Sequence, residues 1–338
     1  MEQINTFSNN NRTNIEILDN YQGSIYNLGD LDVKLEGCYS TLDNQSEVVT
    51  FIHEQFTKNA DLYSKTYTNY DYFEWLIKNC LEKINTRKDI PIKILDIGSG
   101  SGNTIIPMVK LFPRSDIIGS DLSLELLFKL KQNIDELEKK SNIVLLQLNA
   151  EKLTFSKNSF DLVVGGAILH HLFHPEKTIE GCLNILKDDG YAFFFEPFEE
   201  GNMILCYVYE TILNDKKCEM DLRTKTFLQN MINDYKIRKG TDKDKEIFSK
   251  IDDKWLFTKS YFYELSERLG FSKCIIYPIH DSIHQFENQT LTNLRFIDPN
   301  PEKLLSVSTW DKIRSFDEYF SEEFKKELII EGCVIFKK

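Results

Sequence analysis

The stretch ILDIGSGSGNT, residues 94–104, decides the fold of this chain. An apolar run containing Asp96 leads directly into glycines at three alternate positions, Gly98, Gly100 and Gly102. A glycine-rich turn between a strand and a helix brings the backbone against a ligand and directs the amino-terminus of the helix at it. The pattern therefore predicts a ligand at this turn. The alternative is a tight turn that binds nothing.

The segments around this turn alternate between short apolar runs and helical periodicity. We expect strands at residues 92–97, 116–121, 142–148, 160–167 and 191–197. We expect amphipathic helices at residues 104–112, 123–137 and 175–187. Pro175 suits the first turn of the last helix, and Gly190 lies just beyond its end. Fully apolar strands separated by amphipathic helices are typical of a parallel sheet covered on both faces, so the sequence predicts a doubly wound α/β domain.

The chain before this domain is expected to be a largely helical extension, residues 1–88, that covers the ligand site. Its first part is rich in asparagine, and residues 24–40 have room for a short strand or two. Apolar spacing over residues 47–85 is helical, beginning with Val48 and the residues after it. This spacing predicts two helices joined near residues 67–71.

The rest of the chain divides into a core and two insertions. We expect the α/β core at residues 89–200, a helical lid insertion at 201–257, and the C-terminal part of the core at 258–338, with a second insertion at about 284–327. Within the C-terminal part, the expected elements are a helix at 258–271, a strand at 272–280 and a closing strand at 328–338. Selectivity for a substrate is expected to reside in the insertions, because loops at the carboxyl edge of such a sheet complete its pocket.

The composition indicates a soluble globular protein, since 41% of its 338 residues are hydrophobic and 28% are charged. A net charge of −12 argues against nucleic acid and anionic membranes as partners, because both attract clustered Lys and Arg. The first residues contain no basic region followed by an apolar run, so we expect no signal peptide. No stretch approaches the roughly 20 apolar residues that span a bilayer. We therefore expect a cytoplasmic protein.

Seven cysteines are scattered along the chain without a C-x-x-C pair or a spacing typical of metal ligands. They are Cys38, Cys80, Cys182, Cys206, Cys218, Cys274 and Cys333. We expect reduced, mostly buried thiols, and we expect no metal site.

Two ligand classes use a glycine-rich turn at the carboxyl edge of a doubly wound sheet: dinucleotides and S-adenosylmethionine. A dinucleotide site has the spacing G-x-G-x-x-G, whereas here Asn103 occupies the position of the third glycine. Asp121 ends the second expected strand, 19 residues past Gly102, where a carboxylate can accept both hydroxyls of a ribose. Both ligand classes contain a ribose, so Asp121 does not separate them. The alternative for Asp121 is a surface acid at the end of a strand.

Further motifs follow the expected strands in order. They are GSDLS, LNAEKLTF, FDLVV, LHHL, LKDDGY and, at the end of the chain, EGCVIFKK. In order and spacing, residues 90–197 resemble the class I S-adenosylmethionine-dependent methyltransferases, especially the small-molecule group, and the match is looser at 258–280 and at the closing strand. The resemblance implies a Rossmann-like, seven-stranded, mostly parallel sheet whose closing strand lies antiparallel beside the sixth.

The resemblance also implies how the cofactor is held. Asp96 and the backbone of the glycine-rich turn, including Ser99, are expected at the methionine portion of S-adenosylmethionine. Asp121 and the adjoining Leu122 are expected at the ribose.

The adenine is expected beside Asn149 and Ala150. Asn149 stands where the family more often has Asp, but its amide can accept from the exocyclic amine and donate to a ring nitrogen. Farther upstream, the segment NADLYSKTY resembles the aromatic segment that closes over the cofactor in this group, with Tyr63 as the candidate residue.

Three residues are candidates for catalysis: His170, His171 and Glu196. An imidazole near neutral pKa can take a proton from a hydroxyl acceptor. The alternative is that LHHL is common in the group whatever the substrate, with one histidine packed under the sheet edge and the other near the cofactor. Glu196 follows the fifth strand, and it either orients an acceptor or caps its loop.

The sequence therefore predicts methyl transfer from S-adenosylmethionine to a small-molecule acceptor, by O- or N-methylation of a natural-product or sugar-type metabolite. An NAD(P)-dependent oxidoreductase and a non-catalytic binding protein with the same fold are the alternatives. Transfer of another group from the cofactor also stays open. The sequence does not decide between a monomer and a homodimer.

Overall fold

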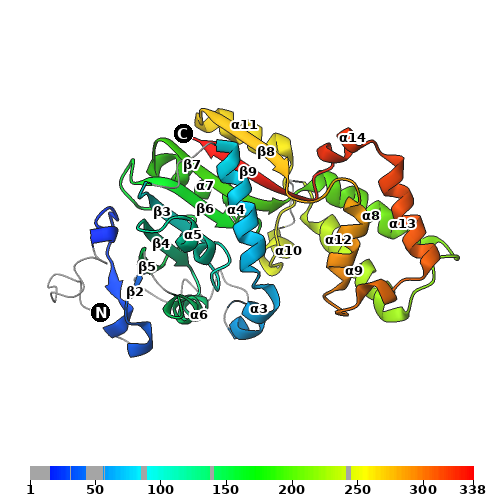
Figure 1. The fold of residues 1–338 in the computed structure, drawn as a ribbon, viewed down its shortest axis with the longest axis horizontal. Helices are drawn as coiled ribbons and strands as arrows, with labels where there is room; N and C mark the ends of the chain where they lie inside the picture. Colours follow the sequence, from blue (N-terminus) through cyan, green and yellow to red (C-terminus); the bar gives the residue numbers. More distant parts are fainter. Residues whose placement is uncertain are drawn as a thin grey trace. The chain divides into compact units, whose positions relative to one another are not determined.

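The computed structural model describes residues 16–30, 32–42, 56, 58–84, 90–137, 141–240 and 245–338. The chain divides into two compact units. The first lies within residues 1–194, 265–274 and 335–338, and the second comprises residues 195–264 and 275–334 (Figure 1). The two insertions expected from the sequence thus fall in one unit, the second.

Within the described ranges, nine strands form one sheet in the order β1-β2-β5-β4-β3-β6-β7-β9-β8. The strands are β1 Tyr26–Asn27, β2 Cys38–Ser40, β3 Lys93–Ile97, β4 Asp116–Asp121, β5 Asn142–Gln147, β6 Phe160–Gly166, β7 Leu186–Pro197, β8 Lys273–Pro278 and β9 Glu331–Lys337. The doubly wound α/β prediction is confirmed.

The strand order reverses beside β3. β3 pairs in parallel with β4 on one side and with β6 on the other, and β4 pairs in parallel with β5. The chain therefore runs outward from β3 to β5 and then returns past β3 to continue at β6. Helices α5 Ile105–Leu111, α6 Leu124–Asp135 and α7 Pro175–Ile185 make the connections between strands. Open α/β sheets bind ligands at such a switch point, and the glycine-rich turn follows β3 there.

The sheet has two more strands at one edge than expected. We predicted seven strands, but β1 and β2 extend the sheet beyond β5. β2 pairs in parallel with β5, and the buried Ser40 hydroxyl donates to Gln147 Oε1 at 2.8 Å. The expectation of a short strand or two within residues 24–40 is confirmed. The count of seven is wrong because those strands join the main sheet.

The closing strand lies between β7 and β8, as the resemblance implied. Ile279 N donates to Glu331 O at 3.0 Å, while Ser272 N donates to Lys337 O at 2.8 Å. The partner number falls as the residue number rises, so β9 runs antiparallel to β8.

Strand β7 begins earlier than the sequence suggested. Pro175 does occupy the first turn of α7, but the helix ends at Ile185, and β7 starts at the next residue. Gly190 therefore lies inside a strand, and the prediction that it follows the end of the helix is wrong. Its carbonyl accepts from Lys338 N at 3.0 Å, so backbone pairing with the closing strand replaces the expected loop.

Helices α3 Ala60–Tyr67 and α4 Tyr70–Ile84 precede the glycine-rich turn and are joined where we predicted. The expected helical start around Val48 lies outside the described residues. α4 contacts α5, and α3 contacts α6. Short 3-10 turns are η1 Leu28–Asp30, η2 Val33–Leu35, η4 Leu169–His171 and η5 Pro301–Lys303.

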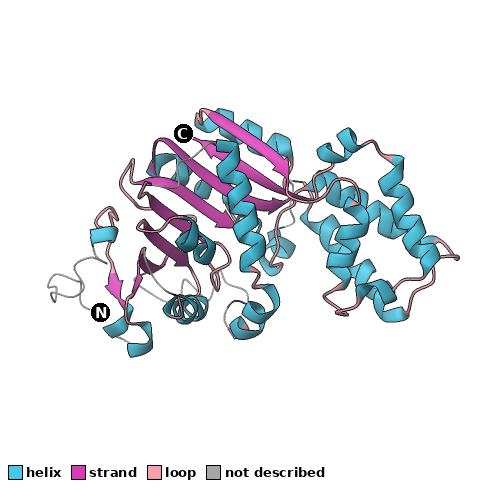
Figure 2. Ribbon diagram, in the orientation of Figure 1, coloured by secondary structure: helices cyan, strands magenta, loops and turns pink. Residues whose placement is uncertain are grey.

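The second unit is built mainly from helices (Figure 2). They are α8 Glu199–Asn214, α9 Leu222–Arg238, α10 Lys245–Lys250, α12 Gln285–Leu294, α13 Val307–Tyr319 and α14 Glu322–Glu327, while α11 Lys259–Leu269 has residues in both units. Helices from both insertions share one buried core, whose largest members include Tyr209, Phe286 and Trp310. The insertions thus form one unit with a core of its own.

The cysteines are buried, apart from the partly exposed Cys274, and none is in a disulfide. Burial raises the pKa of the Cys38 thiol to about 11. None of the helices in the described ranges combines the length and the apolar composition that a bilayer crossing requires.

Candidate cofactor site

The glycine-rich turn is held in a conformation that needs glycine. Gly98 and Gly100 have φ angles of 67° and 52°, in the left-handed region that side chains disfavour. A Cβ on Gly98 would lie 2.7 Å from the Ile168 side chain, so glycine is needed there for packing. A Cβ on Gly100 would meet nothing within 4 Å. Gly98 therefore serves the fold, whereas Gly100 presents bare backbone to open space.

Asp96 lies beneath this turn and is fully buried. The Thr104 hydroxyl lies 2.7 and 2.8 Å from its two carboxylate oxygens. Burial raises the pKa of Asp96 to about 7, against the opposing effect of hydrogen bonds from Ser99 and Thr104. The backbone is tied as well, since Ser99 N donates to Ser120 O at 2.8 Å. These contacts organise the turn, and a direct contact of Asp96 or Ser99 with the methionine portion stays a prediction.

Asp121 reaches the turn from the end of β4. Its Oδ2 accepts from Gly100 N at 2.9 Å, and its Oδ1 accepts from Ser123 N at 2.8 Å. Burial raises the pKa of Asp121, while these backbone N–H groups oppose the rise. A carboxylate offers about four acceptor positions. The Leu122 N–H also lowers the pKa of this carboxylate, so acceptor capacity is left for a ribose hydroxyl, and the contact of Asp121 with a ribose stays a prediction. The adjoining Leu122 accepts from Gln147 Nε2 at 3.0 Å through its carbonyl.

The loop after β5 carries the two residues expected beside the adenine. Asn149 Oδ1 accepts from Glu151 N at 2.9 Å, and the Ala150 carbonyl accepts from the Thr178 hydroxyl at 3.0 Å. The loop is therefore fixed at both residues. The amide oxygen of Asn149 already accepts from Glu151 N. The NH₂ group of Asn149 is therefore the part of the amide that we expect to act on adenine, by donating to a ring nitrogen. Its contact with adenine stays a prediction.

Tyr63 belongs to a row of aromatic rings on and beside α3. Its ring centroid lies 4.9 Å from that of Phe56 and 4.8 Å from that of Tyr67, and Phe56 lies 5.3 Å from His171. Sequence reasoning found Tyr63 alone. The spacing of four residues between Tyr63 and Tyr67 on a helix was a signal for the second ring. Nothing in the sequence pointed to Phe56.

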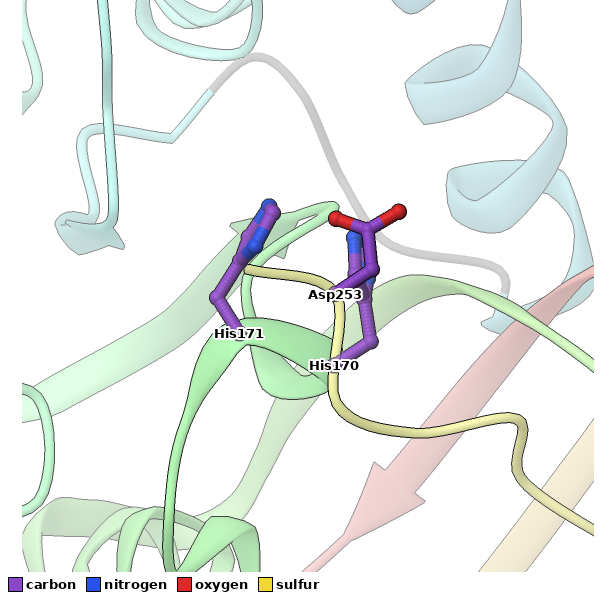
Figure 3. A group of neighbouring side chains, drawn as sticks. All are labelled: His170, His171 and Asp253. Atoms are coloured by element: carbon purple, nitrogen blue, oxygen red, sulfur yellow. The ribbon is translucent and has the colours of Figure 1, made fainter. Parts of the chain in front are cut away.

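The two histidines lie together at the turn after β6 (Figure 3). Their ring centroids are 4.1 Å apart, with His170 buried and His171 half-buried. The charge that His171 can carry lowers the pKa of Asp121, so His171 lies near that carboxylate. Asp253, drawn in the same figure, belongs to the second unit. The structure thus brings His171 together with Asp121 and the aromatic row.

Glu151 is a residue of this region that the sequence analysis missed. Its Oε1 accepts from Phe173 N at 2.8 Å and from His174 N at 2.9 Å. The carboxylate thereby fixes the segment that follows the two histidines. Its signal in the sequence was the acid within the motif LNAEKLTF, which we assigned to the adenine side only.

Glu196 lies near the end of β7, in the second unit, and is fully buried. Within that unit, burial raises the pKa of Glu331 to about 8, and the negative charge of Glu196 contributes to the rise. Arg238 opposes this rise. A role of Glu196 in catalysis stays a prediction.

The residues gathered in the first unit fit S-adenosylmethionine. Asp121 retains acceptor positions for a ribose, Gly100 presents backbone without a side chain, and the aromatic row around Tyr63 supplies apolar surface. The carboxylate of Asp121 also suits a cofactor that carries a sulfonium charge.

Comparison with known proteins agrees with this fit. Residues 94–190 match the sequence model of a family described as a methyltransferase domain. The chain is 25% identical over 162 residues to the ubiquinone/menaquinone biosynthesis C-methyltransferase UbiE of Ectopseudomonas mendocina, covering 46% of this chain and 63% of that protein. It is 29% identical over 147 residues to the malonyl-[acyl-carrier protein] O-methyltransferase of Halalkalibacterium halodurans, covering 42% of this chain and 53% of that protein.

Among solved structures, phosphoethanolamine N-methyltransferase 2 of Haemonchus contortus is similar in fold, with a TM-score of 0.50 and 14% sequence identity over 88% of this chain and 60% of that one. This likeness concerns the fold: a doubly wound sheet with a glycine-rich turn at its switch point and Asp121 at the end of the next strand. Residues 94–190 of this chain are therefore similar to the methyltransferase domain of S-adenosylmethionine-dependent enzymes. The matched parts span less than two thirds of the three relatives described.

Proposed function

We propose that the chain transfers the methyl group of S-adenosylmethionine to a small-molecule acceptor. The observation that carries the proposal is the pair of hydrogen bonds by which Asp121 holds Gly100 and Ser123, because this carboxylate stands beside the bare backbone of the turn and keeps acceptor capacity. The match of residues 94–190 to a methyltransferase domain supports the same conclusion.

Methyl transfer requires little covalent chemistry from the protein itself. When bound, the sulfonium supplies an electrophilic methyl group. The chain must hold an acceptor atom in line with it and exclude water. We assign the holding of the cofactor to Asp121 and to the backbone of the glycine-rich turn. The aromatic row of Phe56, Tyr63 and Tyr67 excludes water from the side of α3.

We propose that the histidine pair takes up the proton that the acceptor loses. Neutral imidazole accepts a proton near neutral pH. His171 is the better candidate of the two, because it is half-buried and lies on the side of Asp121, whereas His170 is buried. For an amine acceptor, deprotonation in solution suffices, and the histidines then orient the nitrogen. Glu196 stays a second candidate for this role.

The acceptor is proposed to be a metabolite that is methylated on oxygen or nitrogen. The two curated relatives are named as a C-methyltransferase and an O-methyltransferase, so the relatives do not agree on an acceptor atom. The net charge of −12 disfavours nucleic acid as the acceptor. The described part of the second unit, with its own helical core, is proposed to select the acceptor.

Titration calorimetry with S-adenosylhomocysteine, NAD and NADP tests the proposal. We expect micromolar binding of S-adenosylhomocysteine alone, weakened at least tenfold in Asp121→Ala, since a charge-assisted hydrogen bond contributes about 1.5–3 kcal/mol. Asp116→Ala is the matched control, because Asp116 begins the same strand and pairs with Asn142 at the opposite edge. Binding of a dinucleotide in place of S-adenosylhomocysteine, or equal affinity in both variants, contradicts the proposal.

A further inference from the structure

Asn103 makes contacts that its place in the motif did not suggest. It follows the last glycine of the turn, and its side chain bonds the link between α3 and α4. Asn103 Nδ2 donates to Tyr67 O at 3.0 Å, and Asn103 Oδ1 accepts from Asn69 N at 2.9 Å. One amide thus satisfies a backbone acceptor and a backbone donor on either side of Thr68. Of the side chains, only that of Asn or Gln offers both groups from one amide.

Other contacts fasten the same segment to the first unit. The hydroxyls of Thr68 and Ser101 lie 3.2 Å apart, so the glycine-rich turn touches the link a third time. At the other end of the segment, the Ser123 hydroxyl donates to Phe56 O. Lys129 of α6 lies 3.4 Å from Asp61 of α3, an exposed ion pair that adds little. Phe56 and the segment 58–69 are therefore held by the turn after β3 and by the start of α6.

The held segment carries the aromatic row. Tyr63 and Tyr67 sit one helical turn apart on α3, and Phe56 packs against Tyr63. Tyr67 is the last residue of α3, and its carbonyl is the group that Asn103 bonds. Movement of the link away from the turn would therefore move the rings with it.

We propose that Asn103 is a positioning residue that seats α3 and its aromatic row against the glycine-rich turn. The seated row then forms part of the cofactor site, which rests on the function proposed above. A cofactor held by the turn and covered by the row favours the seated state, so its apparent affinity depends on how fully that state is populated. Asn103 acts through Tyr67 and Asn69, and it need not touch the cofactor.

Hydrogen exchange of the whole chain tests the seating directly, with Asn103→Ala as the variant. Loss of two exposed hydrogen bonds should speed exchange of the α3 amides about tenfold, while the amides of β5 and α7 stay unchanged. Thr68→Ala removes the third contact and should act in the same direction by a smaller factor. It also preserves the test if Asn103→Ala fails to fold.

Asn69→Ala is the matched control. Asn69 Oδ1 accepts from Tyr72 N at 3.2 Å at the start of α4, whereas the contact with Asn103 uses the Asn69 backbone. The control therefore weakens α4 and keeps the fastening, so its α3 exchange should match that of the wild-type protein. Equal exchange of α3 in Asn103→Ala and the wild-type protein overturns the proposal, as does equal acceleration in Asn69→Ala.

Titration with S-adenosylhomocysteine tests the link to the cofactor. We expect its dissociation constant to rise at least threefold in Asn103→Ala, with the midpoint of global unfolding unchanged. Faster α3 exchange without weaker binding refutes the link between seating and the cofactor. If S-adenosylhomocysteine does not bind the wild-type protein, the proposed function fails, and the exchange data still decide whether Asn103 seats α3.

Discussion

The glycine-rich edge of the first unit and the helical core of the second unit both hold buried carboxylates, but in different ways. In the first unit, Asp96 faces the hydroxyl of Thr104 beneath a turn, and Asp121 holds Gly100, whose backbone faces open space. In the second unit, Asp317 accepts from Phe286 N at 3.0 Å and from Glu287 N at 3.1 Å. Those two residues lie in the first turn of α12.

The difference separates a carboxylate that serves the fold from one that is available to a ligand. The N–H groups of a first helical turn lack partners within the helix, and a carboxylate there satisfies them and suits the helix dipole. Lys325, also buried, donates to Ile283 O at 2.6 Å and to Asp317 O at 2.8 Å. The charges around α12 thus satisfy groups of their own unit, whereas Asp121 sits at a loop with capacity to spare.

The largest predicted effect concerns the pH dependence of Asp96. Its pKa is about 7 in the folded protein, and an unfolded Asp has a pKa of about 3.9. Between these values the unfolded chain ionises Asp96 while the folded chain keeps it protonated, so the free energy of unfolding falls as pH rises. Relative to Asp96→Asn, the wild-type protein should lose about 1.4 kcal/mol per pH unit, about 4 kcal/mol in all.

Denaturant unfolding of both proteins, at pH steps from about 4 to 8, measures this difference. The difference should level off below about pH 4 and above about pH 7, where both states carry the same charge at this position. Parallel curves for the two proteins across the range would mean that Asp96 is ionised in the folded state. It would then carry a buried negative charge beneath the turn.

The next effect is a loss of stability without a loss of binding. Asp317→Ala removes the acceptor of two backbone N–H groups and a counter-charge for the buried Lys325, and it should lower the free energy of unfolding by about 3 kcal/mol. Asp317→Asn keeps an acceptor oxygen and should lose less. Calorimetric affinity for S-adenosylhomocysteine should be unchanged in both variants. A weaker affinity at temperatures where the variant is fully folded contradicts the division between the two kinds of carboxylate.

The sequence predicted the sheet from β3 to β7 well, because both of its signals were strong there. Apolar runs marked the strands, and β4, Asp116–Asp121, has the bounds that we expected. Helical apolar spacing marked the helices between them, as in α6, whose first turn is capped by the Ser123 hydroxyl, which accepts from Leu126 N. The start of β7 was missed because LKDDGY is polar, and its strand conformation depends on backbone pairing with the end of the chain.

The second unit shows what periodicity leaves out. The sequence predicted a helical insertion at 201–257, but not that its buried side chains would share a core with those of a segment about eighty residues later. Asn293 Nδ2 donates to the buried Tyr209 hydroxyl at 2.9 Å, a contact between the two insertions. Such pairings depend on tertiary packing, which a single sequence does not encode as a local pattern. Two separate insertions were therefore the expectation, and one unit is the result.

At the candidate site, the motif residues were predictable and their partners were not. Asp121 and the glycines follow from spacing alone. The sequence indicated of Asn103 only that it is not a glycine, because the two hydrogen bonds of its side chain go to a segment more than thirty residues earlier. Glu151 was hidden in the same way, since its partners follow the next strand. Hydrogen bonds between two loops that are distant in the sequence can be identified only when the fold is known.

The smallest effect separates the two kinds of glycine at the turn. In Gly98→Ala, the left-handed backbone and a Cβ 2.7 Å from Ile168 should together lower the free energy of unfolding by about 2 kcal/mol. In Gly100→Ala, only the backbone is strained, since the Cβ meets nothing within 4 Å, and the loss should be about 1 kcal/mol. Binding should show the opposite order.

Because the new methyl group of Gly100→Ala points into open space beside Asp121, it should raise the dissociation constant of S-adenosylhomocysteine about tenfold. At the same temperature Gly98→Ala should raise it less, provided that the variant is folded. Denaturant unfolding and titration calorimetry on the same two variants measure both orders. If Gly98→Ala is the worse binder as well as the less stable protein, the turn acts as one rigid piece. The space beside Gly100 would then not be where the cofactor lies.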